Sequence, residues 1–335
     1  MLKPTRTVGV IGAGISGLAC AQALQNSGVR VTVLERSQGV GGRVATRRGD
    51  SGATFDHGAQ HFTVRDPAFQ ACVDDWCKSG TVSLWQGRIV VLRQGVLQNL
   101  HEPRERYVGV PGMNAIAKSL AMHIDVRTCV TAETIWYSDG AWHVRDCGGA
   151  HFGPFDFLVM AAPPLQTAKL LAGQSDAFEN LLSTVVMQPC WAVLLQMFER
   201  LPTEFDAAFV HDSPLSWIAR NNSKPERQAS ECWILHASPA WSRDHLEDPT
   251  EFVTRTLVTE FWQALAQTPQ SLEFTFAHRW RYALPQEPLS QRFLLDSNAK
   301  LGACGDWCGG ARVEGAYRSG VALAKAVLEM NQLDE

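Results

Sequence analysis

The chain has 335 residues, 45% of them apolar and 19% charged, which excludes a fibrous or wholly disordered protein and allows two cores of about 150 residues each. Its 30 basic and 34 acidic side chains give a net charge of −4, which disfavours binding to a nucleic acid backbone. No window approaches the roughly 20 apolar residues that span a bilayer, so we expect no membrane span.

Nine cysteines, an odd number scattered among hydrophobic neighbours, argue against a disulfide framework and favour a reducing, cytoplasmic location. The pairs Cys72 with Cys77 and Cys304 with Cys308 lack a second Cys or His pair at the spacing of a zinc site. We therefore expect buried free thiols and no metal.

The N-terminal segment predicts a β-strand, a helix and a second β-strand. Thr7–Ile11 is a short apolar run, apolar residues recur at helical spacing over Ser16–Ser27, and Arg30–Leu34 reads as another strand. Gly28 suits the end of the helix. Together these elements form a βαβ unit, which requires a right-handed crossover and a parallel sheet. The chain therefore opens with half of a nucleotide-binding fold.

The rest of the chain alternates between this fold and a second domain. Asp139-Gly140 marks a hairpin turn, and Pro163-Pro164 ends a strand. The expected helices are residues 111–122, 250–266 and 314–330. The expected strands are residues 131–137, 141–146, 155–161, 191–197, 216–219, 232–236, 274–282 and 300–304.

The predicted fold is therefore α/β: a discontinuous Rossmann-like nucleotide-binding domain with a second, mixed α+β substrate domain. We expect the first domain to comprise residues 1–60, 108–165 and 295–335. The second domain would comprise residues 61–107 and 166–294. In this arrangement the two ends of the chain return to one sheet.

The pattern Gly12-Ala13-Gly14-Ile15-Ser16-Gly17 follows the first strand and opens the first helix. Gly12 permits the tight turn, Gly14 lets a pyrophosphate approach the backbone, and Gly17 lets the helix pack closely on the strand. The helix N-terminus offers N–H donors to the anion. Glu35, at the end of the second strand, is placed to accept hydrogen bonds from ribose hydroxyls. The segment predicts a dinucleotide site.

A second glycine cluster, Gly41-Gly42-Arg43, favours FAD over NAD as the tightly bound dinucleotide. It resembles the Gly-Gly-Arg that flavin amine oxidases carry at the same spacing beyond their ribose-binding acid. Gly42 would let the backbone pass close to the cofactor, and Arg43 offers a donor fork to the pyrophosphate. Arg36, directly after Glu35, is also expected to contact FAD.

The C-terminal segments Gly302–Trp307 and Arg312–Gly320 resemble the flavin motif of the same group. There the acid at the strand end, here Asp306, binds the ribityl chain. The following helix, here near Val313, Glu314 and Ala316, points its positive N-terminus at the flavin and stabilises charge that develops there. Val130 is a further expected FAD contact. We expect no covalent bond from Cys308.

The segments Phe55–Pro67, Tyr107–Met113 and His278–Tyr282 resemble the renalase family, especially its bacterial members, and this similarity runs over essentially the whole chain. The resemblance implies a noncovalent FAD enzyme that oxidises isomeric dihydro forms of NAD(P)H, with hydride at the 2- or 6-position, to NAD(P)+. Electrons would pass to O2, giving hydrogen peroxide. The expected partners are therefore a dihydropyridine dinucleotide and O2.

The resemblance also implies site residues in the middle of the chain. Gly58, Ala59, Gln60 and His61 would pass along the flavin, and Trp280 would border the substrate cavity. His61, Trp280 and Tyr282 are the catalytic candidates, although core packing remains an alternative for the last two because they share one face of a strand.

Other polar residues favour structural roles. His57 and Asp56 are expected to be hydrogen-bonded structural groups near a turn. Arg220, Asn221 and Asn222 are expected in a solvated loop rather than at a phosphate.

Two other functions remain open. Amine oxidases commonly hold a lysine near the flavin on a strand corresponding to Cys190–Leu194, and this strand has none, which favours a dihydropyridine over a protonated amine. An FAD-dependent amine oxidase or dehydrogenase is the first alternative. A noncatalytic FAD-binding sensor or scaffold is the second.

Overall fold

The computed structural model describes residues 6–49, 52–100 and 104–333, and it divides into two compact units. Unit 1 comprises Met1–Arg43, Ile116–Met187 and Leu284–Glu335, and unit 2 comprises Val44–Ala115 and Gln188–Ala283. Each unit contains a large sheet of its own, and each is described separately below.

Unit 1 is built on a six-stranded sheet with the strand order β19-β20-β13-β1-β2-β9. The strands β1, β2, β9, β13 and β20 run parallel, and β19 is an antiparallel edge strand. The sheet strands are β1 (Thr7–Ile11), β2 (Arg30–Leu34), β9 (Asp125–Arg127), β13 (Phe157–Met160), β19 (Leu294–Asp296) and β20 (Leu301–Ala303).

The remaining elements of unit 1 are one smaller sheet and the helices. The three-stranded antiparallel sheet joins β10, β11 and β12 in that order. The bounds are β10 (Ala132–Ser138), β11 (Ala141–Asp146), β12 (His151–Phe155), α1 (Ile15–Asn26), α4 (Pro164–Leu171), α5 (Asp176–Ser183) and α8 (Val313–Leu333). Two short elements, α3 (Ala115–Leu120) and the 3-10 turn η1 (Gly42–Val44), begin at or cross the boundary between the units in sequence.

The central strands β1, β13 and β20 are mostly apolar, and most of their residues are buried. In β13 all four residues are buried, and Val10 of β1 lies between Val33 of β2 and Val159 of β13. Such continuous apolar runs are typical of parallel strands covered on both faces. The parallel sheet brings the carboxyl ends of β1, β2 and β20 to the same edge.

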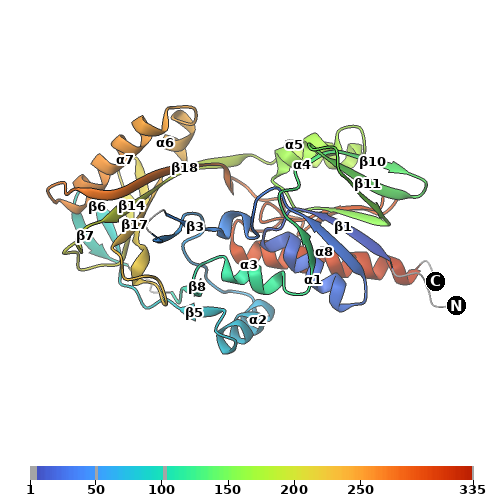
Figure 1. The fold of residues 1–335 in the computed structure, drawn as a ribbon, viewed down its shortest axis with the longest axis horizontal. Helices are drawn as coiled ribbons and strands as arrows, with labels where there is room; N and C mark the ends of the chain where they lie inside the picture. Colours follow the sequence, from blue (N-terminus) through green and yellow to red (C-terminus); the bar gives the residue numbers. More distant parts are fainter. Residues whose placement is uncertain (1–5, 50–51, 101–103, 334–335) are drawn as a thin grey trace. The chain divides into compact units, whose positions relative to one another are not determined.

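The first and last helices of the chain lie side by side in unit 1 (Figure 1). Gly320 of α8 makes this close approach possible, because a Cβ at that position would overlap the carbonyl oxygen of Ser16 in α1. The two chain ends are therefore parts of one structure, as expected for a discontinuous Rossmann-like domain.

Unit 2 is built on a seven-stranded sheet with the order β18-β14-β17-β16-β15-β6-β7. Its elements are β3 (Thr46–Arg48), β4 (Thr54–Asp56), α2 (Pro67–Lys78), β5 (Val82–Leu84), β6 (Ile89–Arg93), β7 (Val96–Asn99), β8 (Tyr107–Gly109), β14 (Met187–Met197), β15 (Ala207–His211), β16 (Leu215–Arg220), η2 (Asn221–Ser223), β17 (Cys232–Ala237), α6 (Pro239–Asp244), α7 (Thr250–Leu265) and β18 (Leu272–Pro285).

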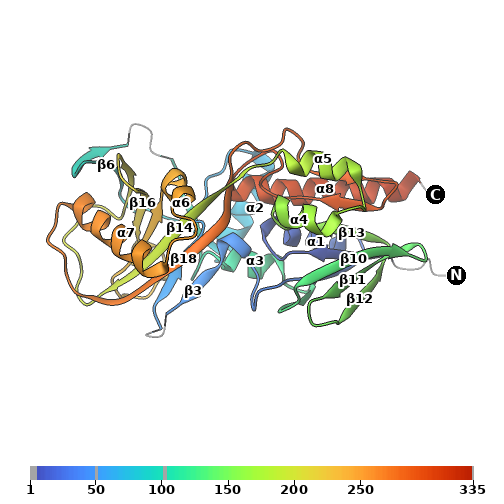
Figure 2. The same cartoon turned by 90° about the horizontal axis from the view of Figure 1, so that it is seen from above.

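The helix α7 closes the main core of unit 2, and Figure 2 shows it beside the strands of the large sheet. Val253, Leu257 and Phe261 recur every four residues, so they form one apolar stripe, and all three are fully buried. Phe261 packs against Trp233 of β17 with ring centroids 5.4 Å apart. This core stabilises the large sheet of unit 2.

The helices and strands expected from the sequence are confirmed, with shifted ends. The helix expected over residues 111–122 is shorter, because a turn that closes with Ala115 N–H donating to the Gly112 carbonyl precedes it. The helix α2 was not expected. Its signal was present in the sequence, because Asp66 accepts from the backbone N–H of Ala68 and Phe69, and Pro67 occupies the first turn.

The boundaries between units differ from those expected. Residues 44–60 and 108–115 belong to unit 2, because β3 pairs with β4 and the Met113 N–H donates to Asp56. Residues 166–187 and 284–294 belong to unit 1, where Leu289 exchanges backbone hydrogen bonds with Trp307 and Gly309.

Candidate functional site

The glycine turn between β1 and α1 has the geometry of an anion-binding loop. Gly12 adopts a φ of +110°, and a Cβ there would lie 2.9 Å from the carbonyl oxygen of Ala161. A Cβ at Gly17 would overlap the Gly12 carbonyl oxygen, whereas a Cβ at Gly14 would meet nothing within 4 Å. Gly12 and Gly17 are therefore required by packing, and Gly14 borders open space.

The N-terminus of α1 is available to an anion. Gly14 caps the helix without a side-chain hydrogen bond, and the first turn contains no acidic residue. Ser16 lies in this turn and is buried. Because the first N–H groups of a helix have no partner within the helix, this end carries partial positive charge.

Glu35 holds the loop from the end of β2, with 6% of its surface exposed. Its Oε2 accepts from the Ala13 N–H at 2.8 Å, and its Oε1 accepts from the Ser37 N–H at 2.8 Å. The backbone of Val130 joins the same group, because its N–H donates to the Glu35 carbonyl at 2.9 Å. Arg36, in contrast, is exposed.

The second glycine cluster docks on the first. The Gly41 N–H donates to the Ala13 carbonyl at 2.8 Å, and Gly41 forms an isolated parallel bridge with Gly14. Gly42 is exposed and has a φ of +53°, a conformation that favours glycine. Two segments expected from sequence to share one ligand are thus in direct contact.

Arg43 and Asp306 form a two-pronged ion pair within unit 1. The Arg43 Nη1 lies 2.8 Å from Asp306 Oδ2, and its Nη2 lies 2.7 Å from Oδ1. Asp306 is buried, and the Arg43 side chain is 32% exposed. The sequence assigned these residues to pyrophosphate and ribityl contacts separately, and the structure brings them to each other.

The helix α8 follows Asp306 in the chain. Val313 is the first helical residue, Glu314 is 1% exposed, and the Ala316 N–H donates to the Arg312 carbonyl at 2.9 Å. The Gly305 N–H donates to the Ser319 hydroxyl of α8 at 3.0 Å, which ties the segment before Asp306 to the helix.

Unit 2 contains a buried polar network around Asp56, named here the Asp56 network. Arg227 donates to Asp56 Oδ2 from Nη2 at 2.7 Å, and Lys224 Nζ lies 3.3 Å from the same oxygen. Lys224 also donates to Gln60 Oε1 at 3.1 Å and to Asn221 Oδ1 at 3.2 Å. Three acceptors therefore surround one buried ammonium group.

The charges of this network stabilise one another. Lys224 and Arg227 lower the pKa of Asp56 to about 2, despite the opposing effect of burial. Burial lowers the pKa of Lys224 to about 8, and the Asp56 carboxylate opposes that shift. Because Lys224 Nζ bonds both Asp56 and Gln60, it closes the turn that carries Gly58 and Ala59.

Three aromatic rings form a second group in unit 2, named here the ring cluster. The centroids of His57 and His278 lie 4.8 Å apart, those of His57 and Trp280 lie 5.0 Å apart, and those of His278 and Trp280 lie 4.3 Å apart. The His57 carbonyl accepts from Trp280 Nε1 at 3.0 Å and lies 3.2 Å from His236 Nε2. Tyr282 has no ring contact with the described part of the chain.

Burial keeps the imidazoles of His57 and His61 in their neutral form. Burial lowers the pKa of His57 to about 3, with help from His278 and Arg47, and burial also lowers the pKa of His61 to about 3. The His61 ring lies between Trp85 and Trp217, at centroid distances of 6.0 and 5.3 Å. Neither Nδ1 atom has a hydrogen-bond partner among the described residues.

Comparisons with known proteins agree with this arrangement. Residues 10–76 match the family model of the NAD(P)-binding Rossmann-like domain. A 70-residue stretch, 21% of this chain, is 39% identical to protoporphyrinogen oxidase 2 of Arabidopsis thaliana, and 55 residues, 16% of this chain, are 47% identical to human lysine-specific histone demethylase 2. These stretches cover only 14% and 7% of the relatives' own lengths.

The solved structures extend the likeness to nearly the whole chain. Cyclohexylamine oxidase from Brevibacterium oxydans IH-35A superposes with a TM-score of 0.73 over 99% of this chain and 100% of its own, at 13% identity. Wild-type putrescine oxidase bound to putrescine gives a TM-score of 0.70 over 97% of this chain and 99% of its own, at 13% identity. The chain therefore has the fold of these two oxidases, and its N-terminal part matches the NAD(P)-binding Rossmann-like domain.

One expectation from the sequence was wrong. Arg220 and Asn221 do not lie in a solvated loop, because they are 2% and 1% exposed. Arg220 Nε donates to Glu231 at 3.0 Å, and the Asn221 amide donates to the Thr54 carbonyl at 2.7 Å. Asn222 is partly buried and donates to Glu231 at 3.3 Å. Asp56 is confirmed as a buried hydrogen-bonded group.

The sequence reasoning also missed Lys224 and Arg227. They lie 168 and 171 residues beyond Asp56, so no local pattern connects them. Nothing in the sequence around either residue indicated this pairing. Lys224 lies after β16 in unit 2 and is buried.

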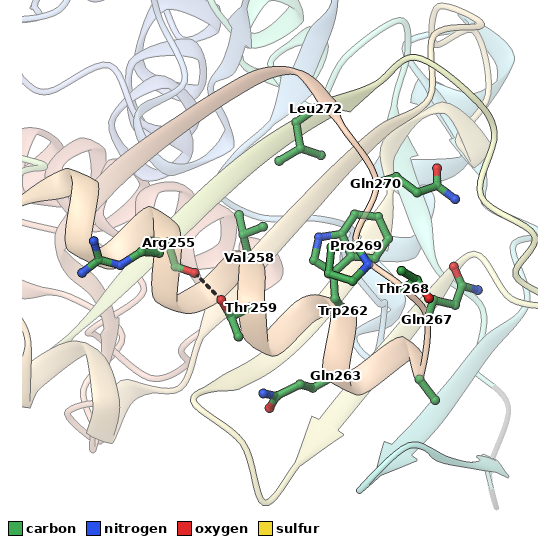
Figure 3. A pocket seen from close by; sticks show the side chains of 11 residues that line it. Arg255, Val258, Thr259, Trp262, Gln263, Gln267, Thr268, Pro269, Gln270 and Leu272 are labelled. Carbon is green, nitrogen blue, oxygen red and sulfur yellow. Dashed lines mark hydrogen bonds between the residues drawn. The ribbon is translucent and has the colours of Figure 1, made fainter.

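A large hollow lies in unit 2, beside α7. It has a volume of about 670 Å³ and lies between the C-terminal half of α7 and the segment that follows (Figure 3). Val258, Trp262, Pro269 and Leu272 give it an apolar wall, and Arg255 is the only charged lining residue. It contains none of the predicted site residues.

The described residues include no group of three or more His, Cys, Asp or Glu side chains that could hold a metal ion, and no helix among them is both long and apolar enough to cross a membrane.

Proposed function

We propose that the chain is a noncovalent FAD-dependent oxidase that converts isomeric dihydro forms of NAD(P)H to NAD(P)+. One dihydronicotinamide, one O2 and one proton would give one oxidised nicotinamide and one hydrogen peroxide. The bound flavin would supply the chemistry, by accepting the hydride and passing its electrons to O2.

The residues of unit 1 fit an FAD dinucleotide. The open space at Gly14 and the uncapped N-terminus of α1 suit a pyrophosphate that approaches the backbone. Glu35 lies at the end of β2, where it would accept from ribose hydroxyls. Arg43 and Asp306 supply the donor fork and the carboxylate next to the start of α8. Gly58, Ala59, Gln60 and His61 belong to unit 2, and their place along the flavin remains part of the proposal.

The charge of unit 2 is the observation that favours a dihydronicotinamide over an amine. The carboxylate of Asp56 is already paired with two cations, and Arg47 adds a third cation near the ring cluster. An ammonium substrate would be repelled here, whereas a neutral ring attached to an anionic dinucleotide would be attracted. The Asp56 network therefore supports the proposed substrate class.

The weak basicity of the histidines favours the same substrate. Oxidation of an amine requires removal of a proton before or during hydride loss, and an imidazole with a pKa of about 3 is a poor base at neutral pH. A dihydropyridine loses hydride without prior deprotonation. His61, Trp280 and Tyr282 would then position or border the substrate rather than move protons.

Anaerobic reduction of the flavin tests the proposal. The purified protein should be yellow, and acid should release its flavin into the supernatant. Dihydro-NAD(P) with hydride at the 2- or 6-position should bleach the flavin rapidly, and ordinary NAD(P)H should do so slowly or not at all. Readmitted O2 should restore the colour and yield one peroxide per substrate.

Three results would overturn the proposal. If the purified protein is colourless and added FAD does not bind to it, FAD is not its cofactor. Faster bleaching by simple amines would favour an amine oxidase, the activity that the names of the cyclohexylamine and putrescine oxidase relatives suggest. A flavin that stays oxidised with every dihydropyridine and amine would favour a sensor or scaffold.

A further inference from the structure

The strand β18 carries a continuous row of rings on one face within unit 2. Its alternate residues Phe274, Phe276, His278 and Trp280 share this face because side chains of a strand alternate. Phe274 stacks on Phe55 of β4 with centroids 5.8 Å apart. The strand pair β3 and β4 therefore packs along the row that ends in the ring cluster.

Arg47 of β3 lies over this row. Its guanidinium carbon is 3.6 Å from the centroid of the Phe276 ring, and Phe276 is two residues from His278. Arg47 and Phe55 are register partners in the β3–β4 pair, so their side chains lie on the same side of that pair. Arg47 thus lies over the face of β18 that carries His278.

No carboxylate compensates the charge of Arg47 among the described residues. The buried acid on the neighbouring strand β4, Asp56, is paired in register with Thr46, whose hydroxyl donates to it at 2.8 Å. Its other oxygen receives Lys224 and Arg227. The positive charge of Arg47 reaches His57 and His278, where it helps to lower the pKa of both imidazoles. The partly buried guanidinium of Arg47 can bind an anion, and the uncharged rings of the ring cluster can contact a planar ring. This arrangement therefore suits a ligand in which an anionic group is attached to a planar ring.

We propose that Arg47 is a specificity residue that binds a phosphate of the dihydronicotinamide substrate while the ring cluster contacts its ring. This inference rests on the proposed function. A guanidinium that stacks on Phe276 through its face keeps its N–H groups at its edge, where they can form two parallel hydrogen bonds to a phosphate. His57, His278 and Trp280 offer an uncharged surface on which a neutral dihydropyridine can stack.

The matched variants are Arg47→Gln and Arg48→Gln. Both remove one positive charge from the same strand, but Arg48 is exposed and its side chain points to the opposite side of β3. Arg47→Lys keeps the charge and loses the planar fork. Each variant is purified with bound FAD, and its melting temperature is compared with that of the wild type.

The probes differ in phosphate content. They are the 6-dihydro forms of nicotinamide riboside, which has no phosphate, of nicotinamide mononucleotide, and of NAD and NADP. Anaerobic flavin reduction gives an apparent dissociation constant and a limiting rate for each, and binding of NADP+ to the oxidised protein gives an equilibrium constant without turnover.

We expect Arg47→Gln to weaken binding of the phosphate-bearing probes and of NADP+ about tenfold or more, with the limiting rate nearly unchanged. Binding of the riboside should change less than twofold, and Arg48→Gln should leave all probes unchanged. Arg47→Lys should restore part of the affinity. Salt should weaken NADP+ binding to the wild type more than to Arg47→Gln.

Equal losses for the riboside and the dinucleotides, or equal effects of Arg47→Gln and Arg48→Gln, would overturn the inference. In both cases the wild-type flavin is still reduced, so the proposed function stands. If no probe reduces the wild-type flavin, the proposed function fails instead, and NADP+ binding alone decides whether Arg47 recognises a phosphate.

Discussion

Arg43 and Asp306 are 263 residues apart in the chain and are joined by two parallel hydrogen bonds of 2.8 and 2.7 Å. The pair connects the glycine cluster after β2 with the strand end of β20, so it fastens the N-terminal and C-terminal parts of the Rossmann-like sheet. A carboxylate has about four acceptor sites, so Asp306 can hold Arg43 and still accept from a ligand hydroxyl.

Replacing Asp306 with Ala should weaken FAD binding about tenfold or more, because an anionic hydrogen-bond acceptor is lost and a donor is left unpaired. FAD titration of the apoprotein measures this, and its melting temperature is recorded alongside. Arg127→Ala, which breaks a surface pair with Asp125, is the control. A destabilised Asp306→Ala apoprotein with unchanged FAD affinity would show that the carboxylate serves the fold alone.

Gly14→Ala and Gly17→Ala should separate cofactor binding from folding. The new methyl group at Gly14 enters open space, so stability should be retained while FAD affinity falls at least tenfold, because the methyl occupies the place of the pyrophosphate. At Gly17 the methyl group would overlap the Gly12 carbonyl, so the apoprotein itself should lose about 1–3 kcal/mol. Thermal unfolding and FAD titration measure the two effects, and unaltered FAD binding by Gly14→Ala contradicts the proposed site.

Asp56→Asn should destabilise the chain by about 3–5 kcal/mol, because it leaves two buried cations without their carboxylate. Lys224→Met should cost less, because Asp56 keeps its ion pair with Arg227. Urea unfolding at pH 7 measures both. A smaller loss for Asp56→Asn than for Lys224→Met would mean that the network does not depend on the carboxylate.

The stability of the chain should fall as the pH drops from about 6.5 towards 3. His57 has a pKa of about 3 in the folded chain and an ordinary value of 6.5. Between these values the unfolded chain binds the proton and the folded chain does not, so acid favours unfolding. His57→Phe should reduce this pH dependence by up to about 1.4 kcal/mol per pH unit.

Urea unfolding between pH 4 and 7 provides the measurement for His57→Phe. The control is His151→Phe, an exposed histidine of β12, which should leave the slope unchanged. Identical slopes for the wild type and His57→Phe would show that the imidazole is not kept neutral by burial.

The local patterns of the sequence determined the elements and the dinucleotide loop. Thr7–Ile11, the glycine pattern after it and Glu35 lie within one βαβ unit, so spacing alone relates them. The requirement for Gly12 and Gly17 follows from a short-range turn and from close helix packing, and residue type reports both directly.

Only the tertiary structure decided which distant residues meet. Asp56 finds Lys224 and Arg227 across more than 160 residues, and Arg47 finds Phe276 on a strand near the end of unit 2. The same applies to Arg220, which the sequence placed in solvent and the structure buries against Glu231. A charge carries no periodicity that identifies its partner, and its burial depends on the acids and donors that the completed sheets bring to it.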